Sequence, residues 1–189
     1  EDFQMFERDL PGQNTTGWGS SKEDIGDLPK EICETINGSW GFNLRDRKHK
    51  SSKELIHYLV KAAGYGSNLL LNVGPMPNGK IQPTHIKSLM KLGNWLKLYG
   101  ETIYETRQGP LNPNVNYVST QKNNKVYIHF LNSEKTNYEF NGIKNSAIKS
   151  IKYFNSNLDV EYSHSNNILT INLNKDIIDD IDTIITISL

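Results

Sequence analysis

The sequence has a single cysteine, no long apolar run and no surplus of charge of either sign, and each absence excludes something. With Cys33 alone, no disulfide can form within the chain. The longest apolar runs are far too short to cross a bilayer, so we expect no membrane span. The 21 basic and 21 acidic residues cancel, and this leaves no basic field that would hold nucleic acid.

Motifs for cofactors and metals are also missing. The turn at Gly74–Lys80 is not a phosphate loop, because Ile81 stands where Ser or Thr is needed. The five histidines are scattered, without the spacing of metal ligands. We therefore predict no cofactor and no metal. The chain starts at Glu1 without an initiator Met or a signal-peptide pattern, so we expect a mature product or a fragment.

The most ordered pattern in the chain is a short apolar run at Asn68–Val73, which the turn Gly74-Pro75 ends. Its length suits a strand, and the lack of polar alternation predicts a strand that is buried on both faces, as in a parallel sheet or barrel. Helical patterns precede and follow it. In such α/β folds the carboxyl ends of the strands usually carry the chemistry.

Both flanking helices have clear boundaries in the sequence. Ser51 and Glu54 form a capping-box pattern that begins a helix over Ser52–Ala63, and Gly64 is expected to end it. Pro83 begins the second helix and Gly100 ends it. Apolar residues mark the expected buried faces, namely Leu55, Ile56, Leu59, Val60 and Ala63 in the first helix and Ile86, Leu89, Met90, Gly93 and Leu96 in the second.

The segment before these helices has one predicted strand. Residues 1–30 are rich in Gly, Asp, Ser and Pro and predict a long irregular loop. Glu31–Ile36 predicts a strand that runs into a loop with Trp40 and Phe42, whose rings could stack on a sugar or pack as ordinary core. Asn37 begins a glycosylation sequon, and a glycan there would obstruct a site at Trp40.

The composition changes after Thr106. Gln108–Pro113 is a Gly/Pro linker, and short β patterns broken by Asn, Ser and Lys follow it. We expect strands at 125–131, 137–140, 148–154, 158–162, 168–173 and 183–189. Regular short strands favour an antiparallel β-sandwich. It holds no pairing of a nucleophile with a base, so a structural role is favoured over glycan binding.

Three blocks of sequence resemble the α-L-fucosidases, glycoside hydrolase family 29. The first is N-L-L-L-N-V-G-P-M-P-N-G-K-I at Asn68–Ile81, which is similar to the family's signature. The second is L-G-N-W-L-K-L-Y-G-E-T-I-Y-E-T at Leu92–Thr106, and the third, upstream, is E-I-C-E-T-I-N-G-S-W-G-F-N at Glu31–Asn43. The resemblance covers about residues 1 to 107. The β-rich remainder of the chain is similar to the family only in its general type of structure.

This resemblance implies a fold class of α/β plus all-β. Residues 1–108 would be the C-terminal part of an irregular (β/α)8 barrel, and residues 109–189 an antiparallel β-sandwich. A whole barrel needs roughly 250 residues, so fewer than half are here. The implied activity is a retaining exo-glycosidase that removes terminal α-L-fucose from glycans. The alternative is an inactive carbohydrate-binding or structural remnant of such an enzyme.

Site residues follow from the same resemblance. The family's Asp nucleophile lies upstream of this chain, so the chain by itself is expected to be inactive. Members often read D-F/Y-x-T-P-E; here Asp2–Glu7 keeps the Asp, the aromatic residue and the Glu, with Met5-Phe6 in place of Thr-Pro. This assigns Glu7 as the acid/base, with Glu31 as the alternative. Trp40 resembles the aromatic residue that contacts the fucose ring and its methyl group.

The expected partner is a fucosylated glycan, with no nucleic acid and no membrane span. The resemblance also implies a secreted, periplasmic or lysosomal location. The sequence carries no signal of oligomeric state.

Overall fold

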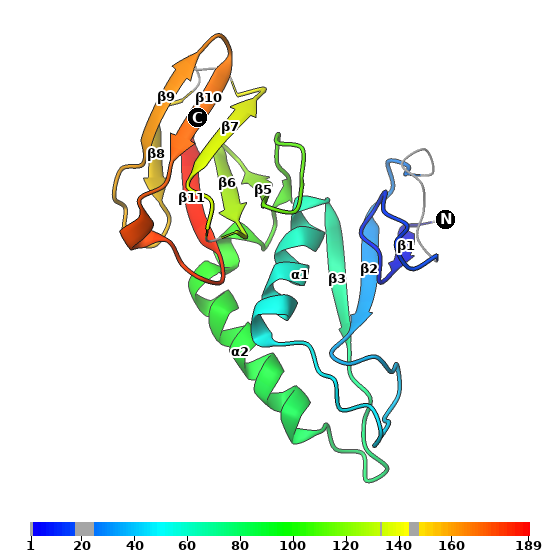
Figure 1. The fold of residues 1–189 in the computed structure, drawn as a ribbon. Coiled ribbons are helices and arrows are strands. Elements are labelled where there is room, and N and C mark those ends of the chain that lie inside the picture. The colour runs from blue at the N-terminus through cyan, green and yellow to red at the C-terminus, as the bar shows by residue number, and fades with distance from the viewer. Residues whose placement is uncertain (1, 18–24, 133, 144–147) are drawn as a thin grey trace. The chain divides into compact units, whose positions relative to one another are not determined.

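The structure, a computed structural model, describes residues 2–17, 25–132, 134–143 and 148–189 (Figure 1). The chain divides into two compact units, Glu1–Glu101 (unit 1) and Thr102–Leu189 (unit 2). The boundary expected from the sequence, between residues 108 and 109, lies further along the chain. Each unit is described by itself below.

Unit 1 is a three-stranded parallel sheet with two helices. In chain order its elements are β1 (Gln4–Glu7), β2 (Lys30–Thr35), α1 (Ser52–Gly64), β3 (Ser67–Asn72) and α2 (Pro83–Tyr99), and a 3-10 turn, η2 (Gly100–Thr102), follows. The strands are hydrogen-bonded in the order β1-β2-β3, and both pairings are parallel. Helix α1 contacts β3 on one side and α2 on the other (Figure 1).

The core of unit 1 lies on the α1 side of this sheet. Phe6 is in register with Ile32, and Ile32 with Leu69, so their side chains share one face. These residues pack with Ala62 and Tyr58 of α1. One apolar face per strand is therefore enough for the sheet to pack against α1.

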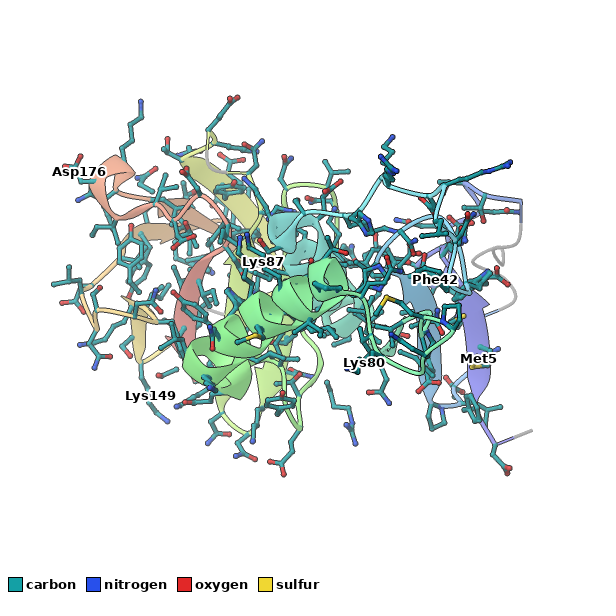
Figure 2. All side chains as sticks on the ribbon, turned by 90° about the horizontal axis from the view of Figure 1, so that it is seen from below. Met5, Phe42, Lys80, Lys87, Lys149 and Asp176 are labelled. Carbon is teal, nitrogen blue, oxygen red and sulfur yellow. The ribbon has the colours of Figure 1, made fainter. Side chains whose placement is uncertain are left out.

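The opposite face of the sheet is open, which corrects the expectation that the 68–73 strand is buried on both sides. Met5, labelled in Figure 2, is 54% exposed, and Leu70 is 45% exposed. The physical reason is position: β3 ends the hydrogen-bonded order of the sheet, and α1 covers only the other face. A parallel sheet with one uncovered face is unusual, because such sheets are normally covered on both sides.

Strand β1 corrects the prediction that residues 1–30 form an irregular loop; residues 1 and 18–24 of that loop lie outside the described part. Only four residues, Gln4–Glu7, form β1, too few to show a period. What makes them a strand is the pairing with β2, some 26 residues away in the register Gln4↔Lys30, and the burial of Phe6. The turn after it closes with a hydrogen bond from the Gln13 N–H to the Leu10 carbonyl, at 2.9 Å.

The helix boundaries largely agree with the prediction, and so does the buried face of α1, where Leu55, Ile56 and Val60 are buried. The capping box is present: the Glu54 N–H donates to the Ser51 hydroxyl, and the Glu54 carboxylate accepts from the Ser51 N–H at 2.7 Å. Gly64 still belongs to α1, and Gly66, with φ of +70°, makes the left-handed turn instead.

In α2 the predicted face is wrong at two of its positions. Ile86 is 44% exposed and Met90 is 64% exposed. The buried residues are His85, Leu92 and Trp95. When a helix has apolar residues on several faces, its packing partners determine which of these faces is buried.

Unit 2 is an antiparallel β-sandwich. Its elements are β4 (Arg107–Gln108), β5 (Tyr117–Lys122), β6 (Lys125–Phe130), β7 (Asn137–Asn141), β8 (Ser150–Tyr153), β9 (Glu161–Ser165), β10 (Ile168–Asn172), the 3-10 turn η4 (Lys175–Ile177) and β11 (Thr183–Ser188). They form one sheet in the order β4-β5-β6-β11-β8 and another in the order β7-β10-β9.

The two sheets of unit 2 share one core. Ile128 of β6 and Ile185 of β11 belong to the same buried cluster as Phe140 of β7 and Leu169 of β10. The expected strand at 158–162 is displaced to Glu161–Ser165, which is polar and exposed along most of its length and pairs only with β10 among the described strands. Its position follows from pairing and not from apolar alternation, which is why the sequence misplaces it.

Candidate active site

The carboxyl ends of the three parallel strands of unit 1 meet at one edge of the sheet. Glu7 is the last residue of β1, Thr35 of β2 and Asn72 of β3. The register Thr35↔Asn72 makes β2 and β3 end level with each other, and Glu7↔Cys33 places the end of β1 two residues earlier. The segments that leave this edge begin with Arg8, with the loop that holds Trp40, and with the turn at Gly74. This is the edge at which parallel α/β folds place their chemistry.

Both predicted acid/base candidates lie on the open face of the sheet. Glu31 is in register with Met5, and Glu7 with Cys33. Because side chains two residues apart point to the same side of a strand, Met5, Glu7, Glu31 and Cys33 share this face. Glu7 and Glu31 are both half-buried. Glu7 stands at the carboxyl edge, whereas Glu31 stands at the second residue of β2, nearer the opposite edge.

The pKa of the Cys33 thiol reflects its burial and the charges near this face. Burial raises its pKa, and the neighbouring Glu7 carboxylate raises it further, with smaller contributions from Glu34 and Glu31. The thiol lies 3.5 Å from the Phe6 carbonyl oxygen, to which it donates. The Cys33 thiol therefore lies close to the Glu7 carboxylate on this face of the sheet.

The backbone after Glu7 is held by a buried carboxylate. Asp9 is 2% exposed and accepts hydrogen bonds from the N–H and hydroxyl groups of both Thr15 and Thr16, the amide bonds being 3.0 and 2.9 Å. Burial alone would raise the pKa of Asp9, but these hydrogen bonds outweigh it and lower that pKa. Asp9 is thus a structural anchor that fixes the chain beyond Glu7.

Arg8 connects Glu7 to the Trp40 loop. Its backbone has φ of +62°, a left-handed conformation that is uncommon outside glycine. The Arg8 guanidinium lies 5.1 Å from the centre of the Trp40 ring, and its Nη2 donates to the Gly38 carbonyl at 2.9 Å. Cation–π contact and hydrogen bond together hold the ring in place. Trp40 remains 38% exposed, so part of its side chain is open to solvent.

The turn after β3 supports the same loop from the other side. The Asn72 side-chain amide donates to the Trp40 carbonyl at 2.7 Å. Gly74 is packed so tightly that a Cβ there would lie 2.5 Å from the backbone of Gly41 and Phe42. Only glycine permits this approach, which explains the residue at the head of the Gly-Pro turn.

Neither Arg8, Asn72 nor Gly74 was singled out as a site residue from the sequence. The signal available was position, since each follows or ends a strand next to the predicted edge. Asn37 also differs from the expectation that a glycan there would obstruct Trp40. It is 3% exposed, so the folded chain has no room for a glycan on its side chain.

The described residues include no grouped metal ligands and no membrane-spanning helix. Among them, no three His, Cys, Asp or Glu side chains are grouped so as to hold a metal ion. In the same residues, no helix is long and apolar enough to cross a membrane.

Comparison with known proteins finds one family throughout. The sequence model for a family described as alpha-L-fucosidase matches residues 1–101. The human plasma alpha-L-fucosidase is 37% identical over 109 residues, which is 53% of this chain and 23% of the human protein. An alpha-L-fucosidase of Dictyostelium discoideum is 33% identical over 102 residues, 51% of this chain and 22% of that protein.

Solved structures agree and extend over both units. Alpha-L-fucosidase isoenzyme 1 from Paenibacillus thiaminolyticus has a TM-score of 0.82 at 29% identity, over 100% of this chain and 45% of its own. The Thermotoga maritima alpha-fucosidase in complex with a mechanism-based inhibitor has a TM-score of 0.78 at 25% identity, over 100% of this chain and 43% of its own. The chain thus spans about a quarter of the curated relatives it matches and less than half of these solved structures.

Proposed function

This chain belongs to the alpha-L-fucosidase family, and on that premise we propose that it is the C-terminal portion of a retaining exo-glycosidase that removes terminal α-L-fucose from glycans. One observation carries the proposal. The family match covers residues 1–101, which is the whole of unit 1, and unit 1 contains the strand edge with Glu7 and Trp40.

The sheet of unit 1 is proposed to be part of an irregular (β/α)8 barrel. Strands β1 and β3 each have one neighbour only among the described residues, and the face with Met5 and Leu70 is bare. Further parallel strands on either side would close a barrel and would turn that face into its packed interior. Glu7, on the same face at the carboxyl edge, would then point into the mouth of the barrel.

The chemistry is proposed to be a double displacement. A nucleophilic carboxylate from outside this chain attacks C1 of fucose while the protonated Glu7 gives its proton to the departing glycosidic oxygen. The Glu7 carboxylate then takes a proton from water as that water attacks C1 and releases the enzyme's nucleophile. Two inversions leave the fucose in its original α configuration. In retaining enzymes the two carboxyl groups lie about 5 Å apart.

Position on the sheet favours Glu7 over Glu31 for this role. The substrate enters at the carboxyl edge, where Glu7 ends β1 and where Arg8 begins the contact with Trp40. Glu31 lies near the start of β2, deeper along the barrel axis. Trp40 is proposed to contact the C–H face and methyl group of fucose with the part of its side chain that is still exposed.

Leaving-group dependence tests the assignment in the full-length protein that contains this chain. Proton donation matters for a sugar alcohol, which departs poorly as an anion, and matters little for an activated phenolate. General acid help is worth about 10² to 10⁴ in rate. Glu7→Ala should therefore lose roughly that factor on a fucosylated glycan, and far less in the first step on a nitrophenyl fucoside.

Glu31→Ala is the matched control, because the two residues share a face and a charge. If Glu31→Ala shows the leaving-group dependence and Glu7→Ala does not, Glu31 is the acid/base. If the parent protein binds fucose but hydrolyses neither substrate, the inactive carbohydrate-binding remnant is the correct alternative. We also propose that the enzyme works outside the cytoplasm, being secreted, periplasmic or lysosomal, because its named relatives include plasma and tissue enzymes.

A further inference from the structure

A pocket of about 280 Å³ lies beneath the loop that joins β2 to α1, on the α1 side of the sheet. Its wall is formed by Arg8 after β1, by Glu34 of β2, by loop residues that include Asn37 and Lys48, and by Glu54 in the first turn of α1. The alternation along β2 puts Glu34 on the face opposite Glu31 and Cys33. The pocket therefore lies on the other side of the sheet from Glu7 and Glu31, and Arg8 takes part both in its wall and in the contact with Trp40.

Three nitrogen atoms in this wall are buried without a hydrogen-bond partner. They are Nε of Arg8, Nδ2 of Asn37 and Nδ1 of His49. Asn37 is 3% exposed, so its amide is shielded from bulk water. Nε of Arg8 and Nδ2 of Asn37 are donors, and a buried donor without an acceptor costs about 1–3 kcal/mol, so these two groups indicate a ligand with acceptor oxygens.

The charges of the pocket indicate the sign of that ligand. The two carboxylates are already engaged. Glu34 accepts from the Lys50 ammonium at 3.2 Å, and Glu54 accepts from the Ser51 N–H at 2.7 Å, a bond that lowers the Glu54 pKa. Lys50 is neutralised by the first of these contacts. Arg8 and Lys48 bring two further positive charges to the wall, so its charged side chains are positive on balance, although Lys48 also acts on the Glu54 carboxylate.

We propose that this pocket binds an oxyanion, a carboxylate or sulfate group such as an acidic sugar carries. Arg8 and Asn37 would donate to its oxygens from the buried side, and Lys48 would approach from the exposed rim. Hydrogen bonds of this kind are about twice as strong as those between neutral groups. The inference goes beyond fucose hydrolysis and does not depend on it, because it rests on the pocket alone.

Titration calorimetry on the full-length protein at constant ionic strength tests the proposal. The probes are sodium sulfate and glucuronate, with glucose and sodium chloride as controls. Glucuronate and glucose differ in the carboxylate that the pocket is proposed to bind. We expect saturable binding of sulfate and of glucuronate and none of glucose or chloride. If sulfate binds and glucuronate does not, the ligand is a free anion and the acidic-sugar source is excluded.

Variants locate the binding. Lys48→Gln removes an exposed rim charge and should weaken binding roughly 2- to 5-fold, the size expected of one exposed ion pair. Asn37→Asp replaces the buried donor with a like charge and should weaken it at least about tenfold. Lys53→Gln is the control, because Lys53 is an exposed lysine in the first turn of α1 that does not line the pocket.

The outcomes separate clearly. Saturable anion binding that falls in both pocket variants and is unchanged in Lys53→Gln supports the site, whether or not the protein hydrolyses fucosides. Equal binding of glucose and glucuronate, no binding of any anion, or binding that Lys48→Gln leaves unchanged would each overturn the proposal. Because Lys48 is exposed, its substitution keeps the test valid even if Asn37→Asp fails to fold.

Discussion

The two units bury their sheets in opposite ways. In unit 2 each sheet covers the other, and residues such as Ile128, Leu169 and Ile185 are fully buried by partners from the same unit. In unit 1 a single sheet is covered on one face, while Met5 and Leu70 stay exposed on the other. An antiparallel sandwich is complete in itself, whereas a parallel sheet needs cover on both faces. The unit with the proposed active site is thus the one that we propose is completed by further parallel strands.

The largest expected difference appears when the units are separated. We predict that Thr102–Leu189 expressed alone unfolds in one cooperative transition with dispersed amide NMR signals. Glu1–Glu101 alone should aggregate or unfold without a sharp transition, because it exposes an apolar face and unpaired strand edges. A cooperative thermal transition of isolated Glu1–Glu101 would contradict this expected difference between the two units.

A matched pair of leucine truncations sharpens the same point. Leu169→Ala removes a side chain that is 0% exposed in β10 and should destabilise unit 2 by about 2–5 kcal/mol. Leu70→Ala removes one that is 45% exposed in β3 and should cost this chain under about 1 kcal/mol. Urea unfolding of each variant measures these two losses in the free energy of unfolding. In the full-length protein Leu70→Ala should cost more, because the barrel would cover that face; equal costs in both contexts would argue against the barrel.

Tight backbone packing in the site gives a smaller effect. Gly74→Ala places a methyl group 2.5 Å from the backbone of Gly41 and Phe42, so it should destabilise the fold by about 1–3 kcal/mol and displace the Trp40 loop. The control is Gly41→Ala, since a Cβ at Gly41 meets nothing within 4 Å. Thermal unfolding and the KM for an aryl fucoside measure the two consequences. If both variants behave alike, the close contact does not hold the loop.

The smallest predicted effect is a pH dependence of unit 1 through His85. Burial lowers the pKa of His85 below its ordinary 6.5, the nearby His49 lowers it further, and Asp46 acts in the opposite direction. The unfolded chain therefore binds the proton more readily. Stability from this residue is present above about pH 6.5 and is lost as the pH falls through the lower, folded pKa.

A difference measurement isolates this contribution. The urea midpoint of the parent should fall between pH 7.5 and pH 5 by more than that of His85→Phe, since other titrating groups are common to both proteins. His85 is 1% exposed and its ring meets His49 edge to face, so an aromatic replacement preserves most of the packing. Parallel pH profiles would show that His85 does not titrate on unfolding.

Local signals explain what could be predicted from the sequence. The capping box at Ser51 and Pro83 at the start of α2 act within one helical turn, and both helices begin where these residues require. Strand β1 was missed because four residues become a strand only through pairing with β2. The buried side of α2, with His85 and Trp95, was likewise set by its neighbours and not by its own period.

Some features of the candidate site could likewise be predicted from the sequence, and others could not. Glu7 and Trp40 were assigned by resemblance, which carries information about residues outside the local pattern. The contact between Arg8 and Trp40, and the passage of the Trp40 loop over Gly74, join three strand ends that are far apart in the sequence. No periodicity predicts such contacts, because they exist only once the parallel sheet has formed.

Chemical rescue tests the central claim, that Glu7 is the acid/base of a retaining fucosidase, most directly. In the full-length Glu7→Ala variant, added azide should restore turnover of an aryl fucoside, because azide attacks the fucosyl-enzyme without needing a base. The product should be α-L-fucosyl azide, since this attack is the second of two inversions. Glu31→Ala should show no rescue. No rescue of Glu7→Ala, or β-L-fucosyl azide from a single inversion, would contradict the account, the latter by making Glu7 the nucleophile.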